Sequence, residues 1–471
     1  MQCEPRSLVR LSTFVQQHNQ CAFQRSPHNL RYRIHPSPRL TNPLRYFKYN
    51  TDRLRSFLDR YGDNIGPAVH GSPNDCSCPA ILGAYSNQCP KLPEMIPNNV
   101  PPVTGKELDY IAQVVNGGVV GEGGPFSKRC EHWLQEHLHG SQVFLTPSCT
   151  AALELAALSL DLDPGDEVIV PSYTYMSTAN AFLLRGASLV YVDIDPGTMN
   201  IDPVKVREAI TSKTRAIVPV HYAGVPCDMD AIFEAIGPRK DIYIVEDAAQ
   251  GLFSVDKNGK ALGTIGNLGC LSFGGTKNLT SGGAGGAIIV NDKKLIDRVE
   301  TIREKGTNRP QFLKGEVDHY TWQRAGVSHV LSEMQAAYLW AQLECAEEIQ
   351  SRRLRIWEIY RQALVPLDGE RLELPPICLQ GRHNAHIFFV KLQNKEEVVR
   401  FASAMKDKGI SISAHYSPLH RSVPGSCGRH VLHPQDYAST ESERLIRLPL
   451  FYAMTETQAE YVIEQVKHYF A

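Results

Sequence analysis

The sequence predicts an α/β fold: a large domain with a mainly parallel sheet flanked by helices, then a smaller C-terminal α+β domain. Between residues 95 and 330, short apolar runs alternate with longer runs of helical spacing. Strands that alternate with helices are joined by crossover connections, which make the sheet mainly parallel and cover both its faces. Polar residues follow several of these runs, as expected where such a sheet gathers a ligand at the carboxyl ends of its strands.

The large domain is predicted over residues 95–330. Its expected strands are 143–145, 167–170, 188–192, 215–220, 241–245, 269–273 and 287–290. Its expected helices, where apolar residues recur at helical spacing, are 151–160, 177–184, 203–210 and 229–236.

The smaller domain is predicted over residues 331–471. It is expected to open with one long helix at 332–360, because apolar residues recur there at helical spacing. The remaining expected elements are strands at 387–390 and 410–414, and helices at 396–408, 441–447 and 456–469.

Residues 1–94 form an N-terminal extension of different composition. Residues 1–51 contain one acidic residue, Glu4, against eight Lys or Arg residues. Such an Arg-rich and acid-poor segment resembles an organelle-targeting peptide. The alternative is a nonfunctional extension before a start at Met95, and its own fold is doubtful. Both interpretations predict that residues 1–94 take no part in the chemistry.

Overall composition is that of a globular protein rather than a nucleic-acid or membrane protein. Of 471 residues, 42% are apolar and 21% charged, with a formal net charge of -1. A near-zero net charge gives no electrostatic reason to expect nucleic acid or a membrane surface as a partner. No apolar stretch approaches the roughly 18 residues of a membrane span.

The cysteines predict a reducing compartment, the cytoplasm, rather than a disulfide scaffold. Cys149, Cys227 and Cys270 lie in or beside apolar runs, where a free cysteine behaves as a small hydrophobe. Cys76 and Cys78 have no histidine or second CxxC at metal-site spacing, so no metal is expected.

One lysine and one aspartate are the main candidates for chemistry. Lys277 stands among glycines and hydroxyl residues after the apolar run 269–273, where burial disfavours its charged form. Asp247 ends another apolar run. Pyridoxal phosphate (PLP) needs a lysine nucleophile for its aldehyde and an acid for its pyridinium nitrogen. Alone, Lys277 could be an ordinary loop lysine and Asp247 a helix N-cap. Together the two residues favour a PLP-binding site.

A second group of residues suits the phosphate and ring of such a cofactor. Ser148 and Thr150 follow a strand and open a helix, where free amides attract an anion, although the same pattern also caps helices. Ser272 could add a donor, and Tyr175 could stack on a flat ring or pack in the core. No Walker-type G-x-x-x-x-G-K-[ST] occurs, and no G-x-G-x-x-G opens a βαβ unit, which disfavours a nicotinamide enzyme.

Several further runs resemble one known family. They are the segments 146–150, 199–202, 218–224, 261–266, 303–309 and 335–344. With these runs, residues 96–470 resemble the DegT/StrS family of PLP-dependent sugar nucleotide aminotransferases. The resemblance implies fold type I and a homodimer whose active sites lie at the subunit interface.

The resemblance also implies roles for individual residues. Lys277 would hold PLP and act in catalysis, Asp247 would pair with the pyridine nitrogen, and Gln250 would lie near the phenolic oxygen. Tyr175 would stack on the ring. The phosphate would be held by Cys149, Thr150 and Ser272, and by Ser328 of the partner subunit, where many members have asparagine. Gly274 departs from the family, which often has histidine there.

For substrates, the resemblance implies a sugar nucleotide and glutamate. Lys305 and Arg309 offer charge for a diphosphate, and His415 and Tyr416 belong to a family motif at the pocket rim. The glycine-rich run 117–124 would form a loop near the substrate.

The expected reaction is transamination of a dTDP-4-keto-6-deoxyhexose to the 4-amino-4,6-dideoxy sugar, with glutamate as amino donor. The lysine itself argues for transamination, because the dehydratase branch of the family has histidine at that position. Two alternatives stay open. One is an aminotransferase of the same family that acts at C3 or on a GDP or UDP sugar; the other is a PLP-binding regulator without turnover.

Overall fold

A computed structural model describes residues 95–471, except residues 122 and 379–380. The predictions for residues 1–94, including those for Cys76 and Cys78, lie outside the described residues. Among the described helices, none combines the length and apolar character that crossing a bilayer requires.

In the described part of the chain, eight strands form one sheet in the order β1-β8-β7-β5-β4-β2-β3-β11. All neighbouring pairs are parallel except the two made by β8, which runs antiparallel to β1 and β7. The mainly parallel sheet predicted from the sequence is therefore confirmed. The strands are β1 (Gln142–Thr146), β2 (Glu167–Pro171), β3 (Ser188–Val192), β4 (Thr214–Ile217), β5 (Tyr243–Asp247), β7 (Leu268–Ser272), β8 (Gly286–Val290) and β11 (Arg429–Val431).

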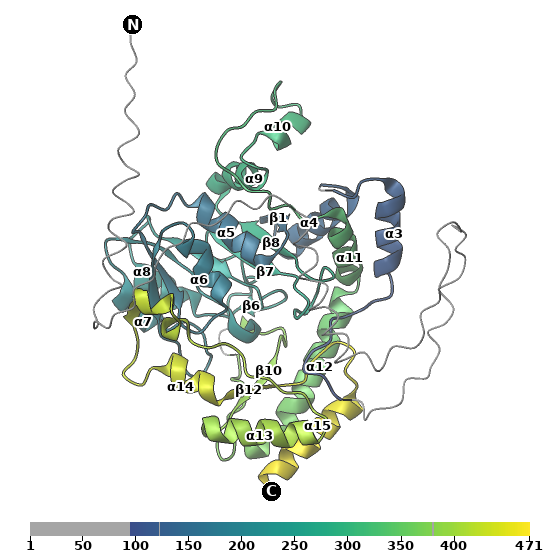
Figure 1. Cartoon of the computed structure of the whole chain (residues 1–471), viewed down its shortest axis with the longest axis vertical. Helices are drawn as coiled ribbons and strands as arrows, with labels where there is room; N and C mark the ends of the chain where they lie inside the picture. Colours follow the sequence, from purple (N-terminus) through teal and green to yellow (C-terminus); the bar gives the residue numbers. More distant parts are fainter. Residues whose placement is uncertain (1–94, 122, 379–380) are drawn as a thin grey trace, which may run out of the picture. The chain divides into compact units, whose positions relative to one another are not determined.

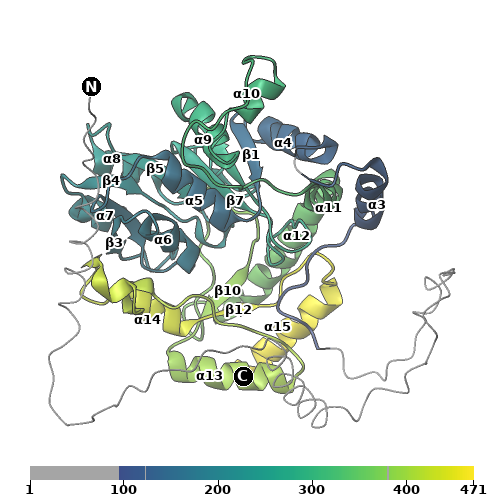
Figure 2. The same cartoon turned by 45° about the horizontal axis from the view of Figure 1, so that its top comes forward.

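Helices cover both faces of this sheet (Figure 1, Figure 2). One face packs on α5, α6 and α9 through residues such as Leu153, Phe182 and Val299. The other packs on α4 and α11 at one end and on α7 and α8 at the other, through residues such as Leu134 and Ile232. The helices are α3 (Glu107–Gly117), α4 (Pro125–His137), α5 (Cys149–Ser159), α6 (Met176–Leu183), α7 (Pro203–Ala209), α8 (Met229–Ile236), α9 (Ile296–Arg303), α10 (Arg309–Leu313) and α11 (Glu333–Glu344).

A second core forms around a two-stranded antiparallel sheet of β10 and β12. Its apolar residues include Tyr360, Phe388 and Phe401, and Ile96 from the start of the described chain joins them. The proposed domain boundary at residue 330 assigns α11 to the smaller domain, although α11 packs on α3 and α4 beside the large sheet. The elements of this part are α12 (Ala346–Leu364), β10 (Phe388–Lys391), α13 (Lys395–Asp407), α14 (Tyr437–Arg444), β12 (Leu445–Leu448) and α15 (Glu456–Phe470); β6 (Val255–Asp256) pairs separately with β9 (Gly381–Arg382).

Three predicted elements differ from the structure. The long helix at 332–360 is two helices, because the backbone leaves helical geometry at Cys345. The segment 410–414 makes only isolated bridges, such as that of Ser413 with Arg447. The predicted helix at 441–447 was wrong in its second half, because Leu445 and Ile446 are buried and belong to β12, paired with β10. Helices α3, α4, α9 and α10 were not predicted.

Candidate active site

A cavity of about 440 Å³ opens at the carboxyl ends of the parallel strands, and both Lys277 and Asp247 line it. Asp247 is the last residue of β5, and Lys277 lies in the connection between β7 and β8. Because parallel strands end at the same edge of a sheet, the fold brings together residues that are thirty positions apart in the chain. The amine and the carboxylate therefore share one cavity, as the sequence predicted.

Lys277 is partly buried, and burial is the main reason why the pKa of its amine lies below its ordinary value. The positive charge of Arg447 lowers this pKa further, whereas the carboxylate of Asp247 acts against the shift. A lowered pKa leaves a larger share of the amine unprotonated at neutral pH. Lys277 is thus suited to act as a nucleophile or a base.

Asp247 is held by two hydrogen bonds. The hydroxyl of Thr178 donates to Oδ2 at 2.7 Å, and the backbone N–H of Ala249 donates to Oδ1 at 3.1 Å. The side chain is 4% exposed. Its carboxylate is therefore fixed in orientation at the cavity wall.

The start of α5 forms the second part of the cavity. Ser148 caps this helix by accepting the N–H of Ala151 at 3.0 Å. The first amides of α5 have no acceptor within the helix, and the helix dipole favours an anion there. Oγ1 of Thr150 and Oγ of Ser177, at the start of α6, lie 2.8 Å apart, so hydroxyls from two helix starts meet at this point.

Cys149 lies at the same helix start and lines the cavity. Burial raises the pKa of its thiol well above the ordinary value, so the group is neutral. It does not repel an anion at this helix start.

Gln250 and Tyr175, predicted beside the ring of the cofactor, also line the cavity. Oε1 of Gln250 accepts the N–H of Ala223 at 2.7 Å, and its Nε2 donates to the hydroxyl of Tyr416 at 3.0 Å. Tyr175 is 52% exposed, with its ring free of the core. Its ring centre lies 6.0 Å from that of Tyr416.

His415 lines the cavity at the end of a chain of hydroxyls. The hydroxyl of Tyr173 donates to that of Tyr222 at 3.2 Å, and the Tyr222 hydroxyl lies 2.9 Å from Nδ1 of His415. Burial, with the nearby charges of Arg447 and Lys277, lowers the pKa of His415 to about 2. The imidazole is therefore neutral, and its Nδ1 shares a hydrogen bond with the Tyr222 hydroxyl.

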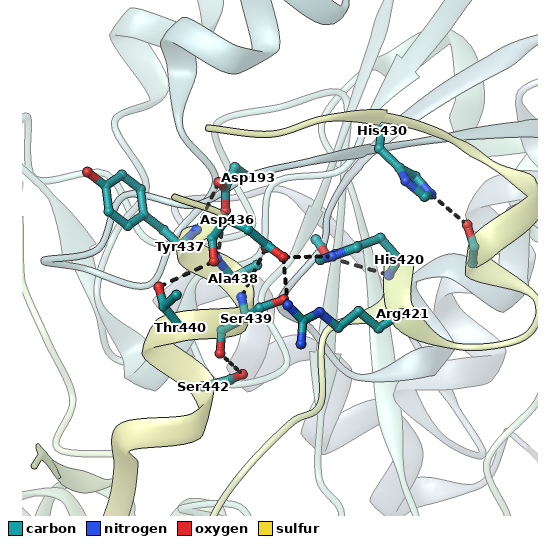
Figure 3. A network of polar contacts seen from close by, with 12 residues as sticks. Asp193, His420, Arg421, His430, Asp436, Tyr437, Ala438, Ser439, Thr440 and Ser442 are labelled. Atoms are coloured by element: carbon teal, nitrogen blue, oxygen red, sulfur yellow. Dashed lines mark hydrogen bonds and ion pairs between the residues drawn. The ribbon is translucent and has the colours of Figure 1, made fainter. Parts of the chain in front are cut away.

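A polar network around His420 and Asp436 (Figure 3) fixes the chain just after His415 and Tyr416. Nδ1 of His420 lies 2.5 Å from the hydroxyl of Ser172, just after β2, and its Nε2 lies 3.3 Å from Asp436. Asp436 caps α14 and also accepts from Arg421 at 3.1 Å. The segment 415–421 is thereby joined to the ends of the large sheet and to α14.

Three residues predicted for the site do not line this cavity. Ser328 forms a β-bridge with Glu304, and the backbone of Lys305 donates to Val327 at 2.9 Å. Arg309 lies 3.6 Å from the carboxylate of Glu304. In the described part of the glycine-rich run 117–124, which joins α3 to α4, no residue lines the cavity either.

Two residues that line the cavity, Ser177 and Arg447, and Thr178, which donates to Asp247, were not predicted from the sequence. Ser177 and Thr178 follow the predicted Tyr175 at a helix start, and this position could have marked them as donors. Arg447 lies in β12, whereas the helix predicted over 441–447 includes it.

The donor set fits PLP. Amides and hydroxyls at two helix starts suit a phosphate, an amine of lowered pKa suits an aldehyde, and a fixed carboxylate suits a ring nitrogen. A close approach between β8 and the start of α5 supports this fit. A Cβ on Gly286 would lie 2.5 Å from the backbone nitrogen of Cys149, so the two elements can lie this close only because residue 286 is glycine. The fold and the site together define a PLP-dependent aminotransferase of fold type I.

More narrowly, the chain belongs to the DegT/DnrJ/EryC1/StrS aminotransferase family, whose sequence profile matches residues 102–467. The members represented among solved structures include sugar aminotransferases. The family predicted from the sequence is confirmed, and with it the class of enzyme and the cofactor.

Individual proteins show the same relationship. The spore coat polysaccharide biosynthesis protein SpsC of Bacillus subtilis is 30% identical over 388 residues, which cover 79% of this chain and 96% of SpsC. The aminotransferase TlmJ from Streptoalloteichus hindustanus is 30% identical with a TM-score of 0.72, over 79% of this chain and 98% of TlmJ. The PLP form of the putative sugar aminotransferase Spr1654 from Streptococcus pneumoniae is 26% identical with a TM-score of 0.72, over 79% of this chain and 98% of Spr1654.

Proposed function

We propose that this protein is a dTDP-4-amino-4,6-dideoxygalactose transaminase, which aminates a dTDP-4-keto-6-deoxyhexose at C4 with glutamate as donor. The observation that carries a transaminase assignment is the shared cavity of Lys277 and Asp247. The sugar and nucleotide are supported by the likeness of the runs 199–202, 261–266 and 303–309 to enzymes of that specificity.

Lys277 is proposed to hold the cofactor and to move the proton. When bound, PLP supplies an electron sink that stabilises negative charge on the carbon beside the reacting nitrogen. Nζ of Lys277 would take the proton from that carbon of the donor and deliver it to C4′ of the cofactor, and in the second half of the reaction it would move a proton from C4′ to the sugar carbon that receives the amine. Its lowered pKa favours the neutral amine that this base requires.

The other cavity residues are proposed to position the cofactor. Asp247 would hold a proton on the ring nitrogen through its negative charge, and Gln250 would lie at the phenolic oxygen. Tyr175 would stack on the ring face. The phosphate would be bound by hydroxyls and by the amides at the start of α5, from Cys149, Thr150 and Ser272.

We propose a homodimer with shared active sites. The segment from α10 to Trp322 projects beyond α9 (Figure 1) and exposes large apolar side chains, with Trp322 77% and Leu313 66% exposed. Such a cluster fits an interface. Burying it against a second copy would let Ser328 reach the phosphate, and Lys305 and Arg309 the diphosphate, of the partner site.

His415 and Tyr416 are proposed to contact the sugar from the same chain, since both line the cavity. We also propose a cytoplasmic location. The described cysteines are free, and several of them, including Cys130 and Cys270, are buried, as suits a reducing compartment.

The test is to incubate the purified protein with dTDP-4-keto-6-deoxyglucose and glutamate and to identify the product by NMR. Formation of the 4-amino sugar with the galacto configuration is expected, and Lys277→Ala should abolish it. Turnover of a 3-keto, GDP or UDP sugar instead would refute the proposed specificity. An absorbance change with glutamate but with no sugar nucleotide would indicate a PLP-binding regulator.

A further inference from the structure

A buried asparagine that does not line the cavity is bonded to both loops of the proposed active site. Asn384 lies between β9 and β10 and is 2% exposed. One loop follows β5 and contains Gln250, and the other follows β7 and contains Lys277. The proposed function assigns no role to Asn384, although it connects the two loops whose side chains would meet the cofactor.

The side chain of Asn384 holds the loop after β5. Its Nδ2 donates to the backbone carbonyls of Gln250 and Leu252, both at 2.7 Å, so both hydrogens of the amide are used. Oδ1 accepts the N–H of His386 at 3.0 Å, which closes a turn of the chain on itself. Any rotation of this amide breaks these bonds, and its position therefore fixes the backbone of residues 250–252.

The backbone carbonyl of Asn384 holds the loop after β7. It accepts Nδ2 of Asn278, the residue after Lys277, at 2.9 Å, and Nε2 of Gln350 in α12 at 2.8 Å. Oδ1 of Asn278 lies 2.9 Å from Nδ1 of His386. Because an amide oxygen only accepts, Nδ1 of His386 carries the hydrogen of this bond. The neighbour of the reacting amine is thus anchored at both ends of its own amide group.

A close approach of the backbone makes room for Asn384. A Cβ on Gly224 would lie 2.0 Å from Oδ1 of Asn384, and Gly224 has a φ of +76°, so only glycine suits this position. The N–H of the preceding Ala223 donates to Oε1 of Gln250 at 2.7 Å. The turn at 223–224 therefore holds the Gln250 side chain, while Asn384 beside it holds the Gln250 backbone.

The turn that carries Asn384 is itself held in one conformation. Ala385 has a φ of +50°, in the left-handed region, and such strain persists only where the surrounding structure enforces it. Arg353 of α12 does so, since its Nε donates to the carbonyl of Ala385 at 3.3 Å and its Nη2 to that of His386 at 2.6 Å. Both loops are therefore anchored to the part of the chain that forms the smaller core.

We propose that Asn384 is a positioning residue, which sets the Lys277 amine at the correct distance from the loop after β5. It acts through Asn278 and through the backbone of residues 250–252. The inference rests on the proposed transaminase function, in which Lys277 must reach the aldehyde of PLP while Asp247 and Gln250 meet its ring. A displacement of about 1 Å in such a site can cost ~10²-fold in rate.

The first measurement follows the reaction of the full-length, PLP-loaded protein with glutamate, as the loss of the visible absorbance of bound PLP. For Asn384→Ala the maximal rate should fall about 30-fold. The glutamate concentration at half-maximal rate should change less than about 3-fold, because Asn384 does not line the cavity. Asn384→Asp keeps the shape but places carboxylate oxygens against two carbonyls, and it should be at least as slow.

Asn291 provides the matched control. Its Nδ2 also donates to two backbone carbonyls, those of Gly263 and Gly266, each at 2.9 Å, and none of these three residues lines the cavity. Asn291→Ala should keep the maximal rate of wild type. An equal loss of rate in Asn291→Ala and Asn384→Ala would overturn the proposal, because general destabilisation would then explain both.

A double variant tests whether Asn384 acts through Asn278. Asn278→Ala breaks the same connection at its other end and should slow the maximal rate to a similar extent. The variant that carries both changes should be little slower than either single variant, since one break already separates the two loops. Losses that multiply would show that the two residues act independently.

The second measurement uses the cofactor-free protein and needs no turnover. Hydrogen exchange of backbone amides, followed by mass spectrometry, reports the opening of each loop. Asn384→Ala and Asn278→Ala should each speed exchange about 10-fold in peptides 248–253 and 273–281, whereas Asn291→Ala should leave 273–281 unchanged. Faster exchange only in the loop that the changed residue contacts would overturn the proposal.

These measurements separate the proposal from the function on which it rests. If the PLP-loaded wild type does not react with glutamate, the donor assignment fails. Hydrogen exchange, and the rate at which added PLP gains its bound absorbance through Lys277, then decide the role of Asn384. If glutamate reacts equally fast in wild type and Asn384→Ala, the transaminase function stands and the positioning role is refuted.

Discussion

Oγ1 of Thr178 donates a 2.7 Å hydrogen bond to Oδ2 of Asp247, and both side chains are buried. Thr178 lies in the first turn of α6 and Asp247 at the end of β5, so the contact joins two elements that meet at the cavity. The Thr178 hydroxyl also lies 2.9 Å from that of Thr174. The carboxylate is therefore held in one orientation before any ligand binds.

Replacing this carboxylate should affect turnover far more than folding. Asp247→Asn keeps the shape of the side chain but removes the negative charge that would stabilise a protonated ring nitrogen. We expect turnover to fall on the order of 10³-fold, measured as kcat with glutamate and the sugar nucleotide. Near-normal turnover would exclude the role. Retained absorbance of bound PLP would show that the protein is folded.

Thr178 should act through the carboxylate and not on the substrate. In Thr178→Val the carboxylate loses one of its two hydrogen bonds, and we expect kcat to fall about 10-fold. Thr178→Ser keeps the hydroxyl and should recover most of the activity. If the serine variant is as slow as the valine variant, packing of the threonine methyl is responsible instead of the hydrogen bond.

The sequence was sufficient to predict the sheet and the Lys277–Asp247 pair, for one physical reason. Strands of a parallel sheet end at a common edge, so residues that follow separate apolar runs come together without any knowledge of side-chain contacts. The apolar runs likewise predicted seven of these strands within a few residues, β1 to β5, β7 and β8.

Local sequence patterns gave the wrong element for Arg447, which lies in a strand and not in the predicted helix. The segment 437–447 is polar and charged up to Arg444, which favours a helix, and β12 contributes only Leu445–Leu448. Burial of this strand depends on pairing with β10, more than fifty positions earlier in the chain. A contact of that kind leaves no periodic signal, and the cavity wall from the smaller sheet therefore remained unpredicted.

The lowered pKa of Lys277 predicts a dependence of stability on pH in the cofactor-free protein. An ammonium that burial disfavours destabilises the folded state at pH values below its folded pKa. This penalty is lost as pH rises from the folded pKa towards the ordinary value of 10.5. Lys277→Met should thus unfold at a higher urea concentration than wild type at pH 7, with a smaller difference at pH 9.5. A difference that grows with pH would contradict the shift.

Glu246, which precedes Asp247 in β5, should matter for stability. Its two oxygens accept four hydrogen bonds in the buried core, from the amides of Gly263, Ile265 and Gly266 and from Nε2 of His221. Glu246→Gln replaces one acceptor by a donor that faces other donors. We expect the free energy of unfolding to fall by about 2–4 kcal/mol, measured by urea denaturation.

The matched control for Glu246 is an exposed glutamate. Glu234 pairs with Arg207 at the surface, with its side chain 76% exposed, and Glu234→Gln should leave the urea midpoint unchanged. Equal effects of the two changes would show that Glu246 contributes no more than a surface charge. Neighbouring side chains of a strand point to opposite faces. Glu246 is therefore hydrogen-bonded in the core, whereas Asp247, the next residue of β5, lines the cavity.

Gly286 allows the start of α5 to lie against β8, and its replacement should weaken the cofactor site. In Gly286→Ala the new Cβ would lie 2.5 Å from the backbone nitrogen of Cys149, so the helix start must move away from β8. Because the proposed phosphate donors belong to this turn, the Kd for PLP should rise at least about 10-fold in a titration of the cofactor-free protein. Gly275→Ala is the control, since its Cβ would meet no atom nearer than 3.8 Å. Unchanged affinity in Gly286→Ala, with a cooperative thermal transition, would mean that the phosphate is bound elsewhere.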